Sequence, residues 1–323
     1  MPATFGQYGK YRLLEMIPGM LSWGILSIAV ISAFAAPTLA VVFIIVFDLY
    51  WMLRVFYFII HVIATYREYR RHLKINWYER LTALPKWDKV YHLVMLPTYQ
   101  EDLTILEEAI ESLLRSQYRK DRFIVVVGGE ERDRKNFERY QEELKKRYQH
   151  HFAALLFTLH PKDTSGEIPG KGSNMRHMGK EVQKYLATQT IDPDDIVVSA
   201  FDVDTIAHPQ YFACLAYLFR TVDKPHHSSY QPITLFSNNI WSAAAPVRVA
   251  AFGTVFWLFS ELVRPERLWT FSSHSMSWKM LTEVGFWEPD IVSEDSRIFM
   301  QGFLHYDGDY RVTPIFLPVS MDA

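Results

Sequence analysis

Two consecutive apolar runs near the start of the chain constrain its fold more than any other feature. Residues 16–36 carry no charged side chain and are about as long as a helix that spans the hydrocarbon core of a bilayer. Pro37 interrupts this pattern, and residues 38–66 form a second apolar run that contains Asp48 and Arg54. Because the runs follow one another without a clear small-residue cleavage site, we expect a membrane hairpin rather than a cleaved signal peptide.

Basic residues follow the second run and predict its orientation. Lys10 and Arg12 also precede the first run, which places both ends of the hairpin on one side. The positive-inside rule makes that side the cytoplasm. We therefore predict a multi-pass membrane protein that contacts lipids through residues 1–66, has a basic linker over 67–90 and a cytoplasmic catalytic domain over 91–323. The basic residues are Arg67, Arg70, Arg71, Lys74 and Arg80.

The net charge argues against a nucleic-acid-binding protein, and the cysteine content excludes a disulfide-stabilised one. The formal net charge is −2, so the chain has no general nucleic-acid signature and we expect no nucleic-acid partner. Cys214 is the one cysteine, so no internal disulfide can form. Its apolar surroundings favour a buried thiol on a helix.

After residue 90 the pattern alternates between strands and helices. Such alternation predicts an α/β domain with a mostly parallel central sheet, in which ligands bind at the carboxyl ends of the strands. The predicted strands are 91–96, 122–127, 152–159 and 196–200, and the predicted helices are 101–118, 133–150 and a third that follows a loop over 162–174.

Carboxylates follow the fourth predicted strand and recur near the end of the chain. Asp202 and Asp204 are one residue apart at a strand end, where they can face a divalent cation and the diphosphate that it carries. Mg²⁺ and Mn²⁺ prefer such oxygen ligands, with phosphates and waters completing the shell. Glu294 and Asp295 could place a general base beside that site. This combination indicates group transfer from a nucleotide-activated donor, although Asp also favours ordinary turns and acids favour a first helical turn.

Four blocks, in order, resemble the membrane-bound family 2 glycosyltransferases of the cellulose-synthase-like and hyaluronan-synthase-like kind. They are Leu96-Pro97-Thr98-Tyr99-Gln100-Glu101, Gly170-Lys171-Gly172-Ser173-Asn174, Asp202-Val203-Asp204 and Ser293-Glu294-Asp295. The resemblance covers about residues 90–320 and the preceding hairpin. It implies a GT-A-type nucleotide-sugar-binding fold and inverting transfer from a nucleotide sugar, most simply a UDP-sugar, to a polysaccharide or lipid-linked acceptor.

The resemblance also implies a role for each residue. Asp295 is the expected base, and Glu294 contacts the acceptor or orients the base. Asp204 is the main metal ligand, and Asp202 completes the cation's shell or holds the ribose. Pro97, Thr98 and Glu101 frame the nucleotide pocket, while Lys171 and Asn174 bind the diphosphate or the donor hydroxyls.

Two departures from the family pattern leave alternatives open. The family's uracil-holding Asp is missing after the second strand, where Gly128-Gly129-Glu130 stands instead, so Glu130 or backbone groups would take its place. The Gln-x-x-Arg-Trp block is also absent, which predicts a chain truncated before that block. The alternatives are single glycosylation of a lipid, a membrane-anchored nucleotide-sugar-binding or secretion-complex subunit without turnover, and a nucleotidyltransferase.

Two aromatic segments have no single interpretation from sequence. Residues 240–267 include an apolar stretch that fits either an interfacial helix or a buried core helix. Trp278, Phe286 and Trp287 precede the proposed base, where they could form a platform for an acceptor sugar or pack in the core.

Overall fold

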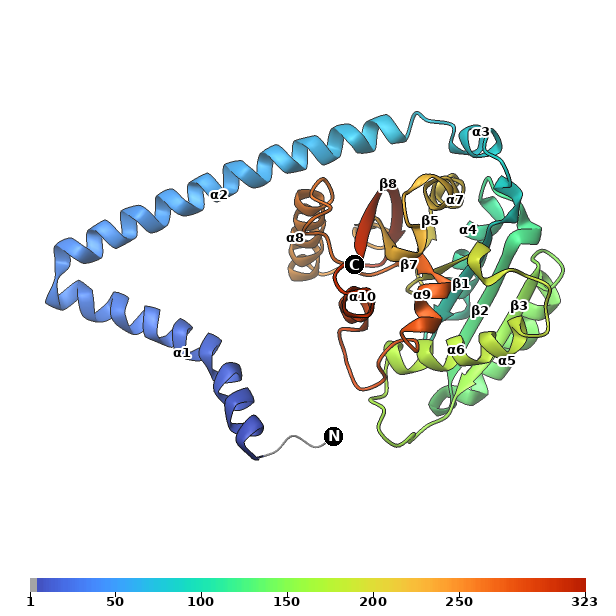
Figure 1. Ribbon diagram of the computed structural model, residues 1–323, viewed down its shortest axis with the longest axis horizontal. Helices are drawn as coiled ribbons and strands as arrows, with labels where there is room; N and C mark the ends of the chain where they lie inside the picture. Colours follow the sequence, from blue (N-terminus) through green and yellow to red (C-terminus); the bar gives the residue numbers. More distant parts are fainter. Residues whose placement is uncertain (1–4) are drawn as a thin grey trace. The chain divides into compact units, whose positions relative to one another are not determined.

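The computed structural model describes residues 5–323. This part divides into two compact units, the first ending at Ile60 and the second comprising His61–Ala323. Residues 1–4 of the predicted N-terminal segment lie outside the described part. Figure 1 shows the course of the chain, and each unit is described by itself below.

The first unit consists of helix α1 (Phe5–Ala35) and most of α2 (Pro37–His72), as the apolar runs predict. The stretches Gly9–Ala35 and Pro37–His72 are long and apolar enough to cross a membrane by length and composition. Among the described residues of this unit almost every large apolar side chain is exposed. An aqueous surface rarely carries so large a continuous apolar area.

The second unit is a mixed α/β structure. Its helices are α3 (Trp77–Thr82), α4 (Leu103–Arg115), α5 (Arg134–Tyr148), α6 (Lys171–Leu186), α7 (Tyr211–Thr221), α8 (Ala245–Glu261), α9 (Trp278–Glu283) and α10 (Glu294–His305). Its strands are β1 (Tyr91–Pro97), β2 (Phe123–Glu130), β3 (Ala154–His160), β4 (Ile196–Ala200), β5 (Ile206–Ala207), β6 (Ser228–Phe236), β7 (His274–Ser277) and β8 (Arg311–Met321). The four strands predicted from the sequence correspond to β1–β4.

The strands form one sheet in the order β3-β2-β1-β4-β7-β6-β8-β5. The predicted half of this sheet, β3-β2-β1-β4, is entirely parallel. Its other half is mixed, because β7 pairs antiparallel with β4 and β6, and β5 pairs antiparallel with β8. The expectation of a mostly parallel sheet therefore holds only for the half that carries the carboxyl ends of β1, β2 and β4.

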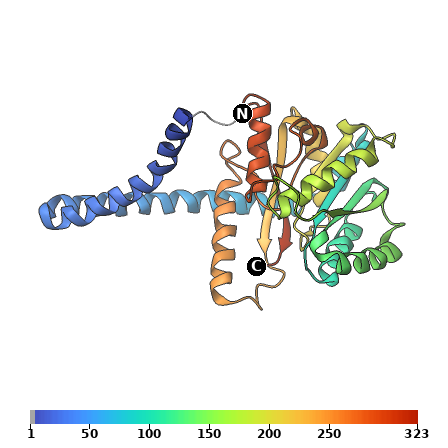
Figure 2. The same ribbon diagram turned by 90° about the horizontal axis from the view of Figure 1, so that it is seen from below.

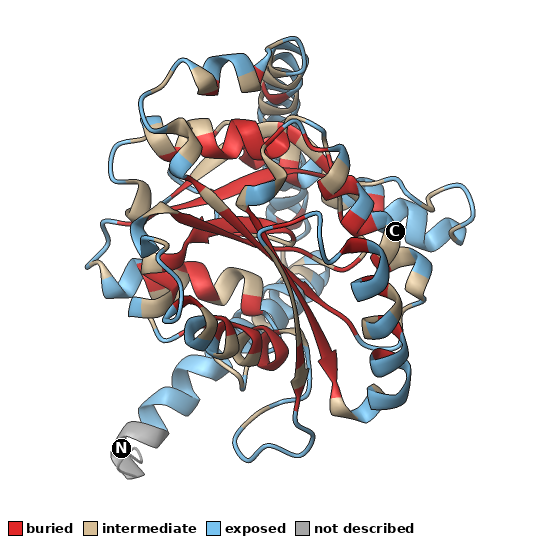
Figure 3. Cartoon of the chain, turned by 90° about the vertical axis from the view of Figure 1, so that its right-hand side faces the viewer, coloured by how far each residue is buried: buried red, intermediate tan, exposed pale blue. Residues whose placement is uncertain are grey.

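Helices cover both faces of the sheet (Figure 2), and a hydrophobic core lies between the sheet and the helices on each side. Alternate residues of β1 point to opposite faces, with Val94 and Leu96 in one core and Leu93 and Met95 in the other. One core includes apolar residues of α3, α4, α5 and α7, and the other includes those of α6, α8, α9 and α10. Figure 3 shows that the strands and the sheet-facing sides of these helices are buried.

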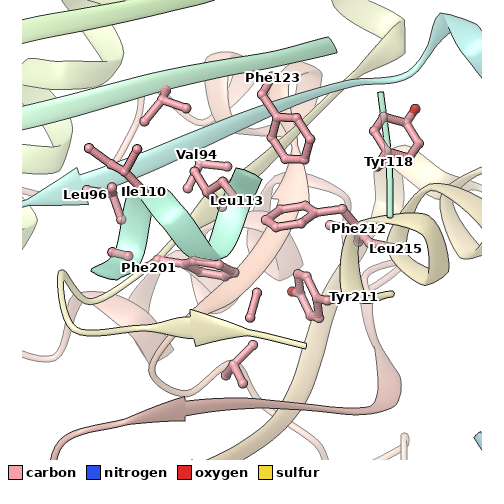
Figure 4. Packing of buried hydrophobic residues seen from close by; sticks show 14 of the residues in the cluster. Val94, Leu96, Ile110, Leu113, Tyr118, Phe123, Phe201, Tyr211, Phe212 and Leu215 are labelled. Carbon is pink, nitrogen blue, oxygen red and sulfur yellow. The ribbon is translucent and has the colours of Figure 1, made fainter. Parts of the chain in front are cut away.

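Aromatic rings fill the core around α7. The rings of Phe212 and Phe123 lie next to each other (Figure 4) and meet edge-on, with a centroid distance of 4.8 Å. His92 lies among the same rings, 4.9 Å from Phe212, and burial lowers its pKa to about 3. Its imidazole is therefore neutral at physiological pH and packs as another ring. Cys214, also on α7, is buried as predicted.

The two ambiguous aromatic segments differ in their burial. Trp278, Phe286 and Trp287 are 3%, 5% and 0% exposed, so they pack in the core and cannot serve as a platform for a sugar. The segment 240–267 contains α8, of which only the C-terminal part packs against the unit. Its Phe252 is 74% exposed and its Leu258 is 1% exposed, so α8 packs into the core along part of its surface and is not a fully buried helix.

Candidate active site

A cavity of about 500 Å³ opens at the carboxyl ends of β1, β2 and β4. Parallel strands bring these ends together at one edge of a sheet, which is where α/β folds bind ligands. Every residue that the sequence assigns to donor or metal binding lines this cavity, whereas Glu294 and Asp295 do not. The predicted residues lining it are Pro97, Thr98, Glu101, Glu130, Lys171, Asn174, Asp202 and Asp204.

The turn after β1 is fixed by Glu101. Its carboxylate accepts hydrogen bonds from the Thr98 hydroxyl at 2.7 Å and from the backbone N–H of Tyr99. The backbone N–H of Thr98 donates to the carbonyl of Gly128 at 2.8 Å, which ties the turn to β2. Gln100 has a φ of 66°, a left-handed conformation that a non-glycine residue adopts at some cost in free energy. Glu101 therefore holds the turn and lines the cavity at the same time.

Glu130 ends β2 and is almost fully buried at the cavity wall. Its carboxylate lies 3.1 Å from Nδ1 of His160 and 3.5 Å from the guanidinium of Arg132. His160 in turn contacts Glu167 through Nε2 at 2.8 Å. Arg132 stacks over the ring of Tyr99 at 4.3 Å, and both residues line the cavity. A buried acid and an aromatic–guanidinium pair thus form one end of the cavity.

The N-terminus of α6 forms a further part of the cavity wall. Lys171 begins this helix, so the predicted loop ends at Gly170 and both Lys171 and Asn174 lie in the first helical turn. Asn174 donates from Nδ2 to the carbonyl of Gly128 at 2.9 Å. A Cβ on Gly128 would collide with the Met178 side chain and a Cβ on Gly129 with the Phe137 ring, so both glycines permit close packing of helices on β2. The free backbone N–H groups and positive dipole of a helix N-terminus attract anions.

Lys171 lies at the centre of a group of carboxylates. Its Nζ is 2.7 Å from Asp202, 3.1 Å from Asp295 and 3.8 Å from Glu294. Burial lowers the pKa of Lys171, but the adjacent carboxylates outweigh that effect and raise it above its ordinary value. Lys171 is therefore charged at physiological pH. It contacts both Asp202, which lines the cavity, and Asp295, which does not.

Asp202 and Asp204 have different environments although they are one residue apart. Burial raises the pKa of Asp202, but its contacts with Lys171 and the Ser272 hydroxyl outweigh this, so the pKa is lowered and the group is ionised. Burial raises the pKa of Asp204 to about 6, in spite of a hydrogen bond of 2.8 Å that it accepts from the backbone N–H of Asp322. Oδ1 of Asp204 is buried and has no hydrogen-bond partner in the described part of the chain.

Asp295 lies between the cavity and a buried histidine. Its carboxylate is 3.7 Å from Nδ1 of His274, a residue of β7 whose pKa burial lowers to about 4, so this ring is neutral at physiological pH. The Thr270 hydroxyl donates to the backbone carbonyl of Asp295. Burial, and then the charge of Asp295, raise the pKa of Glu294. Glu294 and Asp295 occupy the first turn of α10, where the helix dipole favours acidic side chains.

The sequence analysis missed several residues that complete the site. Tyr99 stood inside a recognised block, and its aromatic character was the available signal. His274 gave no signal, because its strand β7 (sequence His-Ser-Met-Ser) has no hydrophobic alternation, and Ser272 lies in the segment before that strand. Over residues 5–323, no group of three or more His, Cys, Asp and Glu side chains is arranged to hold a metal ion.

Comparisons with known proteins give weak similarities. No family model matches the chain. No curated protein matches it either. Three similar solved structures each have a TM-score of 0.43. The mannosyltransferase PcManGT from Pyrobaculum calidifontis, in complex with GDP-Man and Mn²⁺, is 18% identical, and the match covers 80% of this chain and 67% of that one.

The other two similar structures are matched over a smaller share of their length. GalNAc-T7 with UDP, GalNAc and Mn²⁺ is 9% identical, and the match covers 73% of this chain and 44% of that chain. TarS 1–349 of S. aureus is 14% identical, and the match covers 72% of this chain and 60% of that one. A likeness of this strength establishes neither the family nor the activity of the chain.

Proposed function

We propose that this chain is an inverting, family 2-like glycosyltransferase of GT-A type that transfers a sugar from a nucleotide sugar, a UDP-sugar, to a hydroxyl of a polysaccharide or lipid-linked acceptor. The observation that carries the proposal is the cavity at the carboxyl ends of β1, β2 and β4. Asp202, Asp204 and Lys171 line it together, and Lys171 links it to Asp295.

The different lining residues of the cavity would bind different parts of the donor. The nucleoside lies beside Tyr99, Glu101 and Glu130, where an aromatic ring and two carboxylates, of which that of Glu130 is buried, can bind a base and its N–H groups. The diphosphate lies against Lys171 and the N-terminus of α6. Asn174 stays tied to the Gly128 carbonyl through Nδ2, and its Oδ1 is buried without a hydrogen-bond partner within residues 5–323, so it can accept from a donor hydroxyl.

The two aspartates of the cavity fit a divalent cation, Mg²⁺ or Mn²⁺. Oδ1 of Asp204 is a buried oxygen without a hydrogen-bond partner in the described part, and Asp202 supplies an ionised carboxylate beside it. One or two carboxylates are the usual protein share of such a shell, because phosphate oxygens and water provide the rest. The bound cation would supply positive charge against the developing charge of the diphosphate leaving group.

Asp295 is the proposed base. Inversion requires the acceptor hydroxyl to attack the anomeric carbon from the face opposite the diphosphate, and the hydroxyl loses its proton as it attacks. Lys171 holds the Asp295 carboxylate at 3.1 Å, and neutral His274 stands behind it, so the base is kept in one orientation. Glu294, in the same helical turn, contacts the acceptor or supports the base.

The N-terminal helices are the proposed membrane anchor. We infer that α1 and α2 form a hairpin, because both are long, apolar and exposed along their length. The basic residues that begin at Arg67 follow the apolar part of α2 and favour a cytoplasmic position for the second unit. The chain is then a multi-pass membrane protein with domains 1–66, 67–90 and 91–323.

A membrane-anchored nucleotide-sugar-binding subunit without turnover is the second candidate. The observation that favours it is the position of Asp295, which contacts Lys171 but does not line the donor cavity. Release of free sugar from a bound donor, or its transfer to an acceptor, would exclude this candidate, because either requires cleavage of the anomeric bond.

Calorimetry of UDP and GDP binding tests the donor site. The full chain in lipid nanodiscs is titrated with each nucleotide in the presence of Mn²⁺ and again with EDTA, as wild type, Asp204→Ala and Asp290→Ala. Asp290 is an exposed aspartate that does not line the cavity, so it is the matched control. We expect UDP binding that needs Mn²⁺, is lost in Asp204→Ala and is unchanged in Asp290→Ala. If neither nucleotide binds to folded protein, the proposed function is wrong.

A further inference from the structure

A buried histidine next to the donor cavity contacts two carboxylates at once. His160 ends β3 and is 5% exposed. Its Nδ1 lies 3.1 Å from the carboxylate of Glu130, its partner on β2, and its Nε2 lies 2.8 Å from the carboxylate of Glu167. Glu130 lines the donor cavity, whereas His160 and Glu167 do not. We call Glu130, His160 and Glu167 the carboxylate–histidine cluster.

The two contacts determine how many protons the cluster holds. A neutral imidazole has one N–H and one lone pair, so it can donate to only one of two carboxylates, and the other would face the lone pair. Hydrogen bonds at both ring nitrogens therefore require one proton more than a neutral histidine with two carboxylates has. Because imidazole is a stronger base than a carboxylate, that proton lies on the ring, and His160 in this arrangement is an imidazolium.

Other charged and titratable groups face the cluster from the neighbouring elements. The guanidinium of Arg132 lies 3.5 Å from Glu130, and the ring of His177 on α6 lies 5.6 Å from the ring of His160. Burial, and then the charge of His160, lower the pKa of His177, so that ring is neutral at physiological pH. The remaining charged residues beside the cluster line a small cavity there, and they are Lys162 and Asp163.

The carboxylate–histidine cluster is not a ligand site itself. Its two carboxylates contact different nitrogens of one ring, so their oxygens do not surround a single ion, in agreement with the lack of a metal-holding group among residues 5–323. The small cavity beside it measures about 40 Å³. Ligand pockets measure about 300–1,000 Å³, so no organic ligand fits there. The cluster can therefore act on a ligand only through Glu130 and the donor cavity.

The cluster also connects two parts of the donor site that are distant in sequence. The loop over 161–170 carries Glu167 and leads to Lys171 at the N-terminus of α6. His160 is thus joined on one side to Glu130, next to the proposed position of the nucleoside, and on the other side to the loop that precedes the proposed diphosphate site. The last residues of this loop line the donor cavity, and they are Pro169 and Gly170.

We propose that His160 is a positioning residue for donor binding, and that its second ring proton is required to hold Glu130 and Glu167 together. The imidazolium donates to both carboxylates, so it fixes the Glu130 carboxylate in the wall of the donor cavity and fixes the loop against the sheet. Loss of one proton leaves a carboxylate facing a lone pair, so one of the two contacts is lost. The inference rests on the proposed function, because the ligand concerned is the nucleotide sugar.

Calorimetry of UDP binding with Mn²⁺ at a series of pH values tests the proposal on the full chain in lipid nanodiscs. The variants are His160→Gln and Glu167→Gln. Their controls, His151→Gln and Glu142→Gln, replace exposed residues that line neither the donor cavity nor the small cavity. The series runs from about pH 5 to about pH 8, the range in which histidines change charge. Asp204 also titrates in this range, because burial raises its pKa to about 6, but it is present in every sample.

We expect the UDP affinity of the wild type to decline towards the alkaline end of the series, where the ring loses its proton. At the pH of tightest binding, His160→Gln should bind UDP at least about tenfold more weakly, since a hydrogen bond to a charged group is worth about that factor or more. Glu167→Gln should keep its affinity at the alkaline end, because its amide can donate to the lone pair of a neutral ring that donates to Glu130. Both controls should follow the wild type.

Nitrogen-15 NMR of histidine-labelled protein without nucleotide gives a second measurement, at the pH of tightest UDP binding. The resonances of His160 are assigned by their loss in His160→Gln. We expect two protonated ring nitrogens at His160 in the wild type. A ring with a single N–H in the wild type would overturn the proposal.

The outcomes separate this proposal from a structural role and from the proposed function. If His160→Gln binds UDP like the wild type, or more weakly by the same factor at every pH, the proposal is overturned and the donor site stands. The same holds if the wild type shows no alkaline decline, or if Glu167→Gln declines as the wild type does. If neither UDP nor GDP binds to folded wild-type protein at any pH, the proposed function fails and this proposal fails with it.

Discussion

Replacement of Asp204 by Asn should stabilise the fold in the absence of metal while it removes metal-dependent nucleotide binding. Burial raises the pKa of this carboxyl from its ordinary value of 3.8 to about 6. Between these values the folded protein binds the proton and the unfolded chain releases it, so the free energy of unfolding falls as the pH rises through this window. Above about pH 6 the folded state carries the full cost of a buried charge.

The size of the effect follows from the difference in pKa. At about 1.4 kcal/mol for each pKa unit the cost is about 3 kcal/mol, and partial contact with solvent reduces it to about 2 kcal/mol. Asn removes the charge and keeps an oxygen that can accept the backbone N–H of Asp322. For a unit of this size the change corresponds to a rise in Tm of about 4–8 °C at about pH 8, declining towards zero at about pH 4.

Thermal unfolding of the nanodisc-embedded chain, followed by tryptophan fluorescence with EDTA, measures the difference. Asp290→Asn is the control for loss of one negative charge on the surface. Mn²⁺ and UDP together should raise the Tm of the wild type and leave that of Asp204→Asn unchanged, because a ligand stabilises only the state that binds it. A Tm for Asp204→Asn that is lower than wild type, or higher by the same amount at all pH values, would refute the reasoning.

Three further predictions concern the base, the buried cation and β2. Asp295→Asn should retain UDP affinity in calorimetry and lose sugar transfer in a radiolabelled-donor assay, and unchanged transfer would remove its role as base. Lys171→Gln should weaken UDP binding at least about tenfold, since a charged hydrogen bond is worth about 1.5–3 kcal/mol; unchanged affinity would show that Lys171 holds only carboxylates. Gly129→Ala should lower the free energy of unfolding by about 1–3 kcal/mol, because its Cβ meets the Phe137 ring, and wild-type stability in denaturant titration would contradict this packing.

The sequence predicted the half of the sheet whose strands are runs of mostly apolar residues. β1, β2 and β4 are continuous apolar segments, and such segments are recognisable by composition alone. In the other half, β6 and β7 lack such a signal, because buried serines interrupt their apolar residues. Their hydroxyls find partners across the sheet, such as Ser199 with Ser275 at 2.8 Å, and those partners are known only once the strands are paired.

The sequence could predict those site residues that come directly after a recognisable strand. Asp202 and Asp204 come directly after β4, so their place at the sheet edge follows from the strand itself. Lys171 was expected in a loop, because Gly and Ser on either side of it disfavour a helix, yet α6 begins there and its packing against β2 outweighs local propensity. The hydrogen bond from the backbone N–H of Asp322 to the Asp204 carboxylate joins residues far apart in the chain, so the sequence alone could not predict it.

The absence of side chains at Gly128 and Gly129 has a consequence for anyone who wishes to change the donor by directed evolution. Met178 and Phe137 fill the space that side chains at these positions would occupy, and Asn174 donates a hydrogen bond to the Gly128 carbonyl. The contacts of Gly128 with Met178 and Asn174 hold α6, the helix that begins at Lys171, against β2. A library that varies Thr98, Tyr99 and Arg132, which line the cavity, can alter base preference while both glycines are kept fixed. A library that randomises residues 128 and 129 would consist mostly of variants in which the two halves of the donor site no longer meet.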